Sequence, residues 1–288
     1  MRKTSLYLTE QAKQALARRA RATGRSEAEL VRAALDAALA LPAALAQAPT
    51  DPPVPGRLVG VGVGPGDPDL LTALALRALA RADRVVAPTT AVDAVGRAEA
   101  VARQAMPGLR IERLPFAMTP ARAVRDRSIA RAAVAVAAHL DAGEEVAWIT
   151  LGDPLTYSTF PSVAAVVCRR RPSTVVTQVP GIMAFQALAA RTGTVVANER
   201  QRVVIRTALD GDDLDDGLSM PGTTVVVYKG GRRLPELAGA ARACGRAAVA
   251  GELLGMPGER IGDLAELAAA GPASYLATVI VPAEERGR

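Results

Sequence analysis

The segment GVGVGPGDPDLLT, residues 60–72, is a glycine-rich connection between a predicted strand and a predicted helix. It overlaps the end of an apolar run, Leu58–Val63, that has the pattern of a buried strand, and it leads into helical periodicity over Leu70–Ala82. A glycine-rich turn between a strand and a helix lets the backbone approach a ligand closely. The dinucleotide fingerprint G-x-G-x-x-G does not fit, because Asp67 stands where the third glycine is needed. The turn alone is equally compatible with a structural role.

Strands and helices alternate along the chain from Arg57 onward, which predicts an α/β fold with sheets covered by helices. A break near residue 172 predicts two domains, at 56–172 and 173–288. Further strands are expected at Arg84–Ala87, Val146–Thr150, Thr174–Gln178, Val203–Arg206, Thr223–Tyr228, Ala247–Ala250 and Ser274–Val281. Helices are expected at about 93–105, 121–141, 163–171 and 183–192.

Two more glycine-containing loops follow apolar strands. One begins Gly152-Asp153-Pro154, and the other contains Pro180-Gly181. Ligands of open α/β sheets bind beyond the carboxyl ends of the strands, so three such loops predict a binding site. Asp153 is the strongest candidate, because a carboxylate at the end of an apolar strand needs a partner.

The composition excludes several kinds of chemistry. With one histidine, His139, and two cysteines, Cys168 and Cys244, the chain offers neither a multi-histidine metal site nor a disulfide scaffold. We therefore expect no metal, reduced thiols and a cytoplasmic protein, with no signal peptide and no membrane span. His139, Cys168 and the apolar-strand residue Trp148 are interpreted as structural.

The first 50 residues differ from the rest in charge. The chain has a formal net charge of +6, and this head holds eight lysines and arginines against four acids. The net charge of the remaining residues is close to zero, so the first 50 residues are interpreted as a separate part of the protein. Residues 42–55 are rich in alanine and proline, and prolines lack a backbone donor, which predicts an extended linker after a module at 1–41.

Residues 1–41 resemble the ribbon–helix–helix family. The pattern comprises a short alternating strand at 3–8, a helix at about 10–22, and a second helix at about 27–40 that begins with a Ser26–Glu29 capping box. The resemblance implies that two copies pair their strands and read DNA through Lys3, Ser5 and Tyr7. The alternatives are a dimerising cap without DNA binding, or a misassigned translation start.

Three motifs, GVGVGPGDPDLLT (60–72), GDPLTYSTF (152–160) and VPGIMAF (179–185), resemble those of the tetrapyrrole (corrin/porphyrin) methylase family. Further segments, VGRAEA (95–100), Tyr228-Lys229 and GMPGER (255–260), resemble its precorrin-2 C20-methyltransferase branch. The resemblance implies a two-domain α/β homodimer with S-adenosylmethionine in the cleft between the domains. It also implies methyl transfer to C20 of precorrin-2 in cobalamin and porphyrin biosynthesis.

The resemblance also implies site residues. Cofactor-binding positions are expected at Pro65, Leu151, Gly152, Asp153, Thr156, Met183, Ala184, Tyr228 and Gly255. Met183, Ala184 and Tyr228 are also compatible with plain core. Asp67 is the candidate general base, although aspartate between glycine and proline is equally good turn sequence. Candidates for binding the carboxylates of the substrate are Arg113, Arg122, Arg125, Arg200 and Arg202, each of which could instead be solvated.

A methyl group on a sulfonium is already activated, so the implied reaction needs orientation rather than histidine, cysteine or metal chemistry. Three alternatives remain open. The substrate could be the cobalt-bearing equivalent, cobalt-factor II, or the methyl group could go to another ring position. The chain could also be a DNA-binding regulator whose methylase-like domain acts as a sensor.

Overall fold

The computed structural model describes residues 10–32, 56–91, 93–117, 121–209, 213–214, 217–271 and 273–284. The chain forms two compact units, Met1–Asp51 and Pro52–Arg288. No helix among the described residues is long and apolar enough to cross a membrane.

The first unit contains helix α1 (Glu10–Thr23), which is followed by Gly24 at a φ of +66°. Residues 27–32 are helical again. The predicted capping box is present: the Ser26 amide and hydroxyl each donate to the Glu29 carboxylate at 2.9 Å, and the Glu29 amide donates to Ser26 Oγ at 3.2 Å. The predicted strand at 3–8, the candidate DNA-reading residues Lys3, Ser5 and Tyr7, and the linker 42–55 lie outside the described residues.

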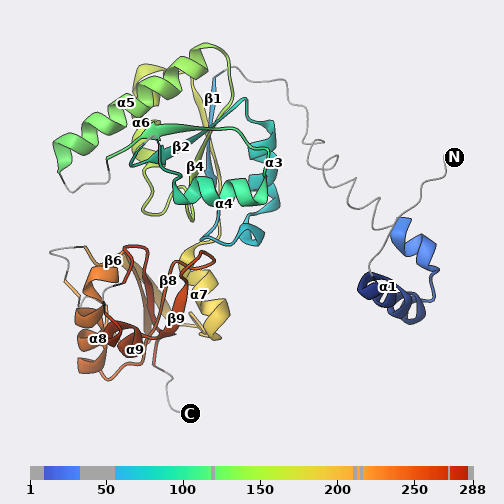
Figure 1. Ribbon diagram of the computed structural model, residues 1–288. Coiled ribbons are helices and arrows are strands. Elements are labelled where there is room, and N and C mark those ends of the chain that lie inside the picture. The colour runs from blue at the N-terminus through green and yellow to red at the C-terminus, as the bar shows by residue number, and fades with distance from the viewer. Residues whose placement is uncertain are drawn as a thin grey trace. The chain divides into compact units, whose positions relative to one another are not determined.

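The first sheet of the second unit is entirely parallel, with strand order β3-β2-β4-β1-β5 (Figure 1). Its strands are β1 (Arg57–Gly62), β2 (Arg84–Thr89), β3 (Ile111–Pro115), β4 (Val146–Thr150) and β5 (Val175–Val179). The connecting helices are η1 (Pro68–Leu70), α3 (Ala73–Arg81), α4 (Arg97–Ala105), α5 (Arg122–Asp141) and α6 (Phe160–Arg170).

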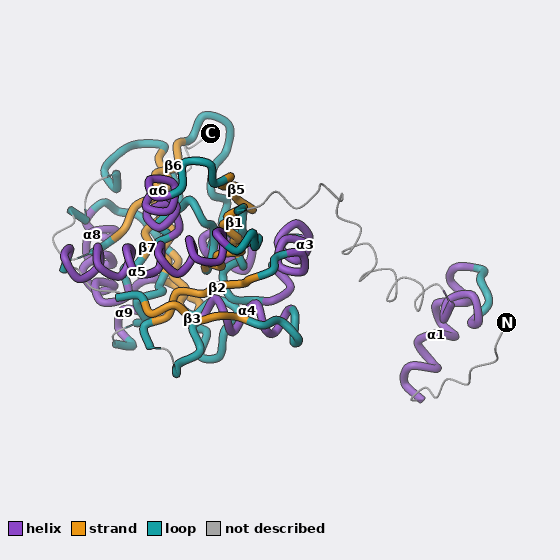
Figure 2. The backbone as a smooth tube through the Cα atoms, turned by 90° about the horizontal axis from the view of Figure 1, so that it is seen from above, coloured by secondary structure: helices purple, strands orange, loops and turns teal. Residues whose placement is uncertain are grey.

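Helices cover both faces of this sheet, and Figure 2 shows the strands between them. Side chains alternate along each strand, so Val59 and Ile149 pack toward α3 and α4, whereas Leu58 and Trp148 pack toward α5 and α6. Burial on both faces explains why these strands read as nearly continuous apolar runs.

The second sheet is mixed, with strand order β6-β7-β10-β8-β9. Only β6 and β7 run parallel; the other neighbours are antiparallel. Its strands are β6 (Arg202–Thr207), β7 (Thr223–Tyr228), β8 (Val249–Glu252), β9 (Arg260–Asp263) and β10 (Thr278–Val281). The helices are α7 (Ala184–Thr192), η2 (Gly231–Arg233), α8 (Leu234–Ala243) and α9 (Leu264–Ala269). Helices α8 and α9 pack on one face, and α7 packs on the other.

The structure corrects several sequence predictions. The predicted domain boundary at 172 separates β5 from its sheet, because β5 pairs with β1 throughout its length. Strand β2 does not stop before Pro88: its pairing with β4 ends at Val86, so no ladder bond is lost where proline lacks a donor. The sequence analysis also missed β3, α8, β9 and α9. These segments are short or carry internal charges, Pro or Gly, which weakens the periodic signal.

Candidate functional site

Three loops meet at the carboxyl ends of β1, β4 and β5. A Cβ atom on Gly62 would lie 2.5 Å from the Gly152 carbonyl oxygen, and one on Gly181 would lie 2.0 Å from the same oxygen. The Gly152 amide donates to the Gly64 carbonyl at 2.7 Å. Glycine is therefore required for the loops to pack backbone against backbone, which accounts for the glycines that the sequence shows there.

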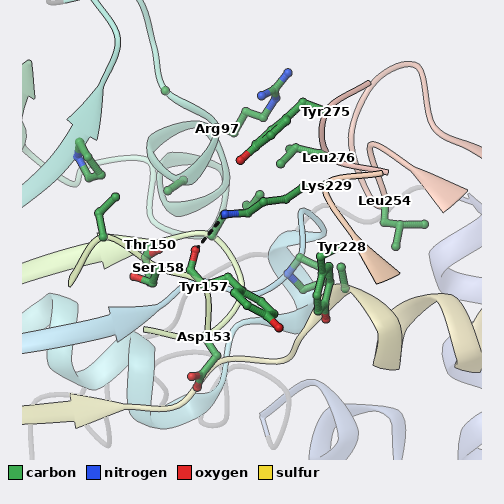
Figure 3. Close-up of a pocket in the computed structure, with 18 of the residues that line it drawn as sticks. Arg97, Thr150, Asp153, Tyr157, Ser158, Tyr228, Lys229, Leu254, Tyr275 and Leu276 are labelled. Carbon is green, nitrogen blue, oxygen red and sulfur yellow. Dashed lines mark hydrogen bonds between the residues drawn. The ribbon is translucent and has the colours of Figure 1, made fainter. Parts of the chain in front are cut away.

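Asp153 joins two of these loops. Its carboxylate accepts from the amide of Leu155 at 2.9 Å, from the hydroxyl of Thr156 at 3.4 Å, and from the amide of Gly181 at 3.2 Å. The partner that the sequence analysis required for this carboxylate is thus the backbone of the neighbouring loop. Figure 3 shows the carboxylate directed away from Lys229.

Loops of both sheets line a cavity of about 680 Å³. That volume is within the range of small-molecule and cofactor sites. The cavity brings together eight of the predicted cofactor-binding residues: Pro65, Leu151, Gly152, Asp153, Thr156, Met183, Ala184 and Tyr228. They come from loops and strand ends separated by as many as 163 positions in the chain (Pro65 to Tyr228), so only the tertiary fold makes them neighbours.

Tyr228 closes one side of the cavity, at the end of β7. Its hydroxyl accepts from the Phe185 amide in the first turn of α7 at 3.3 Å. Burial raises the pKa of Tyr228 to about 12, so the hydroxyl stays protonated and retains a proton to donate. Next to it, Met183 and Ala184 bring the amino end of α7 to the cavity wall.

Two further tyrosines of the cavity were not predicted from the sequence. Tyr157 and Tyr275 line the cavity together with Tyr228, and Lys229 lies between them. Only 3% of the residues are aromatic, so three tyrosines in one cavity are a strong concentration. Tyr157 carries a signal that is visible in the sequence, because it is one of few aromatic residues and lies within the 152–160 motif.

Two predicted residues lie beside the cavity rather than in its lining. Gly255 packs against the backbone of Asp67, where a Cβ atom would come 2.3 Å from the Asp67 amide nitrogen. The Asp67 carboxylate accepts from the Asp69 amide at 3.0 Å and lies 3.5 Å from a guanidinium nitrogen of Arg191. The structure thus shows the turn role of Asp67, and its role as a base stays a prediction.

The predicted substrate-binding arginines do not converge. Arg113 forms a two-point ion pair, at 2.7 and 2.9 Å, with the fully buried Glu99, and this pairing holds the pKa of that carboxyl below its usual range. The others, Arg122, Arg125, Arg200 and Arg202, are exposed and lie outside the cavity lining. The basic residues that do line the cavity are Arg97 and Lys229.

The histidine and the tryptophan have structural environments. His139 contacts Glu112 at 2.9 Å and Glu144 at 2.7 Å, away from the cavity. Trp148 is fully buried, with its ring 6.4 Å from that of Phe116 in an edge-to-face arrangement. Among the described residues, no group of histidine, cysteine and acidic side chains has the arrangement of a metal site.

A model of the family described as Tetrapyrrole (Corrin/Porphyrin) Methylases matches residues 57–268. The chain belongs to this family. The family resemblance carried by the three glycine-containing loops is thereby confirmed, as is the two-domain α/β methylase fold. The match begins at the first strand of the second unit and leaves the ribbon–helix–helix prediction for residues 1–41 untested.

Two curated proteins are similar to this chain in sequence. The chain is 35% identical over 188 residues to cobalamin biosynthesis protein CobIJ of Mycobacterium bovis, which covers 61% of this chain and 36% of that protein. It is 32% identical over 203 residues to precorrin-2 C(20)-methyltransferase of a Sinorhizobium species, which covers 66% of this chain and 80% of that protein. The chain therefore spans about a third of the length of CobIJ but most of the length of the Sinorhizobium precorrin-2 C(20)-methyltransferase.

A solved methylase structure shares the fold. The uroporphyrin-III C-methyltransferase of Thermus thermophilus, complexed with S-adenosylhomocysteine, superposes with a TM-score of 0.54 at 22% identity. The alignment covers 78% of this chain and 97% of that one. The similarity places both sheets within the methylase fold.

Proposed function

We propose that this protein is an S-adenosylmethionine-dependent C-methyltransferase that acts at C20 of precorrin-2 in cobalamin biosynthesis. The observation that carries the proposal is the convergence of the three glycine loops on one cavity shared by both sheets. The substrate assignment is supported by the similarity to the Sinorhizobium precorrin-2 C(20)-methyltransferase, which extends over 80% of that protein.

The cavity fits the proposed cofactor. The loop from Leu151 to Thr156 presents backbone groups, because Gly152 has a φ of +71° and no side chain. The Tyr228 hydroxyl retains a proton for a ligand acceptor. We propose that these groups hold S-adenosylmethionine together with Pro65, Met183 and Ala184, and that Gly255 acts indirectly by seating the loop around Asp67.

The cofactor would supply a methyl group bonded to a positively charged sulfonium sulfur. This sulfur is a good leaving group, so the methyl carbon is already activated for attack. The protein's task is then to hold acceptor and donor in line, which can contribute about 7–11 kcal/mol toward lowering the barrier. We call the three glycine-containing loops that follow β1, β4 and β5 the cradle. Asp153 fixes the position of one cradle loop relative to another by accepting a hydrogen bond from the Gly181 amide. The proposed mechanism assigns no role to a metal, and Asp67 remains the candidate base.

The proposal is tested by incubating the protein with enzymatically prepared precorrin-2 and S-adenosylmethionine. We expect the tetrapyrrole to gain one methyl group and lose one proton, a net mass increase of one CH₂ unit, with the new methyl at C20 by NMR. A parallel reaction with the cobalt complex distinguishes the metal-free from the cobalt-bearing substrate. Cofactor binding by calorimetry without methylation of either tetrapyrrole would overturn the enzyme assignment and favour a sensor domain.

We also propose that the second unit forms a homodimer through its sheet edges. Strands β5 and β6 end their respective sheets, and Val175 and Val203 on them remain 42% and 40% exposed. Val195, in the segment that connects α7 to β6, is 58% exposed as well. An exposed strand edge is a template for pairing with another chain, and exposed apolar surface favours association. Light scattering of the purified protein checks this, and a monomer at micromolar concentration would contradict it.

For residues 1–41 we propose a ribbon–helix–helix module that pairs with its copy and binds DNA through Lys3, Ser5 and Tyr7. Helix α1 and the Ser26–Glu29 capping box support the helical part of this module. Gel shifts at two salt concentrations test it, because phosphate contacts make affinity fall steeply with salt. No shift with the full-length protein would leave dimerisation as its role.

A further inference from the structure

In the described part of the chain, four residues other than glycine have positive φ, and three of them line the cavity. They are Tyr157 at +50°, Lys229 at +62° and Leu253 at +50°. Side chains rarely adopt this backbone conformation, which costs free energy at each position and tends to occur at ligand sites. The direction in which Tyr157 and Lys229 point is therefore set by the fold against local preference.

Lys229 lies between two tyrosine rings (Figure 3). Its ammonium is 5.8 Å from the ring centroids of both Tyr157 and Tyr275, within the distance for a cation–π interaction. It donates one hydrogen bond, to the Tyr157 carbonyl at 3.3 Å. An ammonium has three N–H donors, so two remain available to a ligand.

Among the described residues that line the cavity, none is an acidic partner of the ammonium. Asp153 is the acidic residue of the lining, and its oxygens already accept from Gly181, Leu155 and Thr156. Arg97 lines the same cavity from the first sheet's side and adds positive charge. An anionic group that enters the cavity would therefore meet this ammonium without competition from another carboxylate of the described lining.

We propose that Tyr157, Lys229 and Tyr275 form a substrate clamp in which the ammonium binds a carboxylate side chain of the tetrapyrrole. The two rings, 47% and 48% exposed, offer flat surfaces to the macrocycle. Lys229 is then a specificity-determining residue for polycarboxylate substrates. This inference rests on the proposed function and extends it, because none of the arginines predicted for that task lines the cavity.

The clamp is tested with Lys229→Met, which removes the charge, and Lys229→Arg, which keeps it. The matched control is Arg232→Gln, which removes an exposed charge three positions along the chain and outside the cavity lining. We expect the KM for precorrin-2 to rise about tenfold to a hundredfold in Lys229→Met, the range for a hydrogen bond to a charged group. We expect kcat to change less than about threefold, and Lys229→Arg to recover most of the loss.

Two further readouts separate the clamp from a structural role and from cofactor binding. Affinity for S-adenosylhomocysteine, measured by calorimetry, should be unchanged in Lys229→Met. A loss there as large as the loss for tetrapyrrole would overturn the clamp and assign the ammonium to the cofactor carboxylate. Equal KM values in Lys229→Met and wild type would leave Lys229 as a support for the two rings and would also overturn it.

A binding experiment keeps this inference distinguishable from the proposed reaction. The chain has three lysines, Lys3, Lys13 and Lys229, so ¹³C-labelled lysine gives three Cε signals, and the signal absent from Lys229→Met belongs to Lys229. We expect uroporphyrin, a polycarboxylate porphyrin, to shift this signal and to bind Lys229→Met more weakly than wild type. Absence of methylation with this response intact would remove the reaction only, whereas equal uroporphyrin affinities would remove the clamp only.

Discussion

The two sheets of the second unit contribute different chemistry to one cavity. The first sheet contributes mainly backbone: Gly62, Gly152 and Gly181 pack so closely that their loops leave no room for a Cβ on two of them. The second sheet contributes side chains, with Tyr228 and Lys229 at the end of β7. A parallel sheet gathers its loops at one edge, whereas a mixed sheet alternates the direction of its strands.

This difference teaches where the site tolerates change. A backbone cradle depends on the absence of atoms, so adding a single methyl group damages it. A side-chain wall depends on which group is present, so it can be retuned without moving the backbone. If this contrast holds, a methyl group added to the backbone cradle should cost more than the loss of a hydroxyl from the side-chain wall.

Gly181→Ala should have the largest effect, because its Cβ would come 2.0 Å from the Gly152 carbonyl oxygen and the loops must separate. We expect a loss of about 3 kcal/mol in the free energy of unfolding and at least a hundredfold weaker binding of S-adenosylhomocysteine. Urea unfolding and calorimetry measure the two. The control is Gly239→Ala in α8, which meets nothing within 4 Å and should stabilise by about 0.5–1 kcal/mol. Similar behaviour of both variants would break the contrast.

Asp153→Ala should have the next largest effect, because it leaves the amides of Gly181 and Leu155 without their acceptor. We expect a loss of about 2 kcal/mol in stability and roughly tenfold or greater weakening of S-adenosylhomocysteine binding. Asp153→Asn keeps one acceptor oxygen, so its affinity for S-adenosylhomocysteine should lie between those of wild type and Asp153→Ala. Calorimetry on all three proteins checks the order, and unchanged affinity in Asp153→Ala would refute the placement of the cradle.

Glu99→Gln tests the buried ion pair that joins α4 to β3 of the first sheet. The Arg113 guanidinium holds the pKa of the Glu99 carboxyl below its usual range, so the folded state favours the ionised form. That contribution is present above the ordinary glutamate pKa and is lost as the pH falls through the lowered value. We expect Glu99→Gln to cost about 1.5 kcal/mol at neutral pH and to unfold less steeply in acid than wild type. Parallel acid slopes in the two proteins would contradict this.

Tyr228→Phe should have the smallest effect, because it removes one hydroxyl that accepts from the Phe185 amide. We expect a loss of about 1 kcal/mol and a few-fold weaker cofactor binding. With a pKa of about 12 in the fold, Tyr228 stabilises below the usual tyrosine pKa near 10 and loses that contribution as the pH rises above it. The free energy of unfolding, measured with urea, should therefore decrease less between neutral and alkaline pH in the variant than in wild type. An equal decline would contradict the buried environment of this hydroxyl.

Local signals predicted much of the fold. The apolar runs of β4 and β7 are found at the predicted residues, Val146–Thr150 and Thr223–Tyr228, because buried strands are apolar whatever surrounds them. The segments that the sequence analysis missed, such as β3, carry charges that only their neighbours explain. Arg113 in β3 is polar because Glu99 lies buried beside it, and no local pattern contains that pair.

The glycine loops show the same division within the site. Glycine and proline spacing predicted where the cradle lies, since a turn that must exclude Cβ atoms is visible in the sequence itself. The partner of Asp153 was not visible, because the Gly181 amide belongs to another loop 28 positions away. Nor was the direction of Lys229, which depends on a left-handed backbone and on two rings from separate segments.

The sequence alone determined the α/β class, the family and the position of the cradle, because these depend on local periodicity and on residues that turns require. The fold sets which charges face the cavity. It committed Arg113 to a buried acid and left Lys229 between two tyrosines. The physical reason is that a charge is satisfied by whatever lies within a few ångströms, and that neighbourhood is assembled from distant parts of the chain.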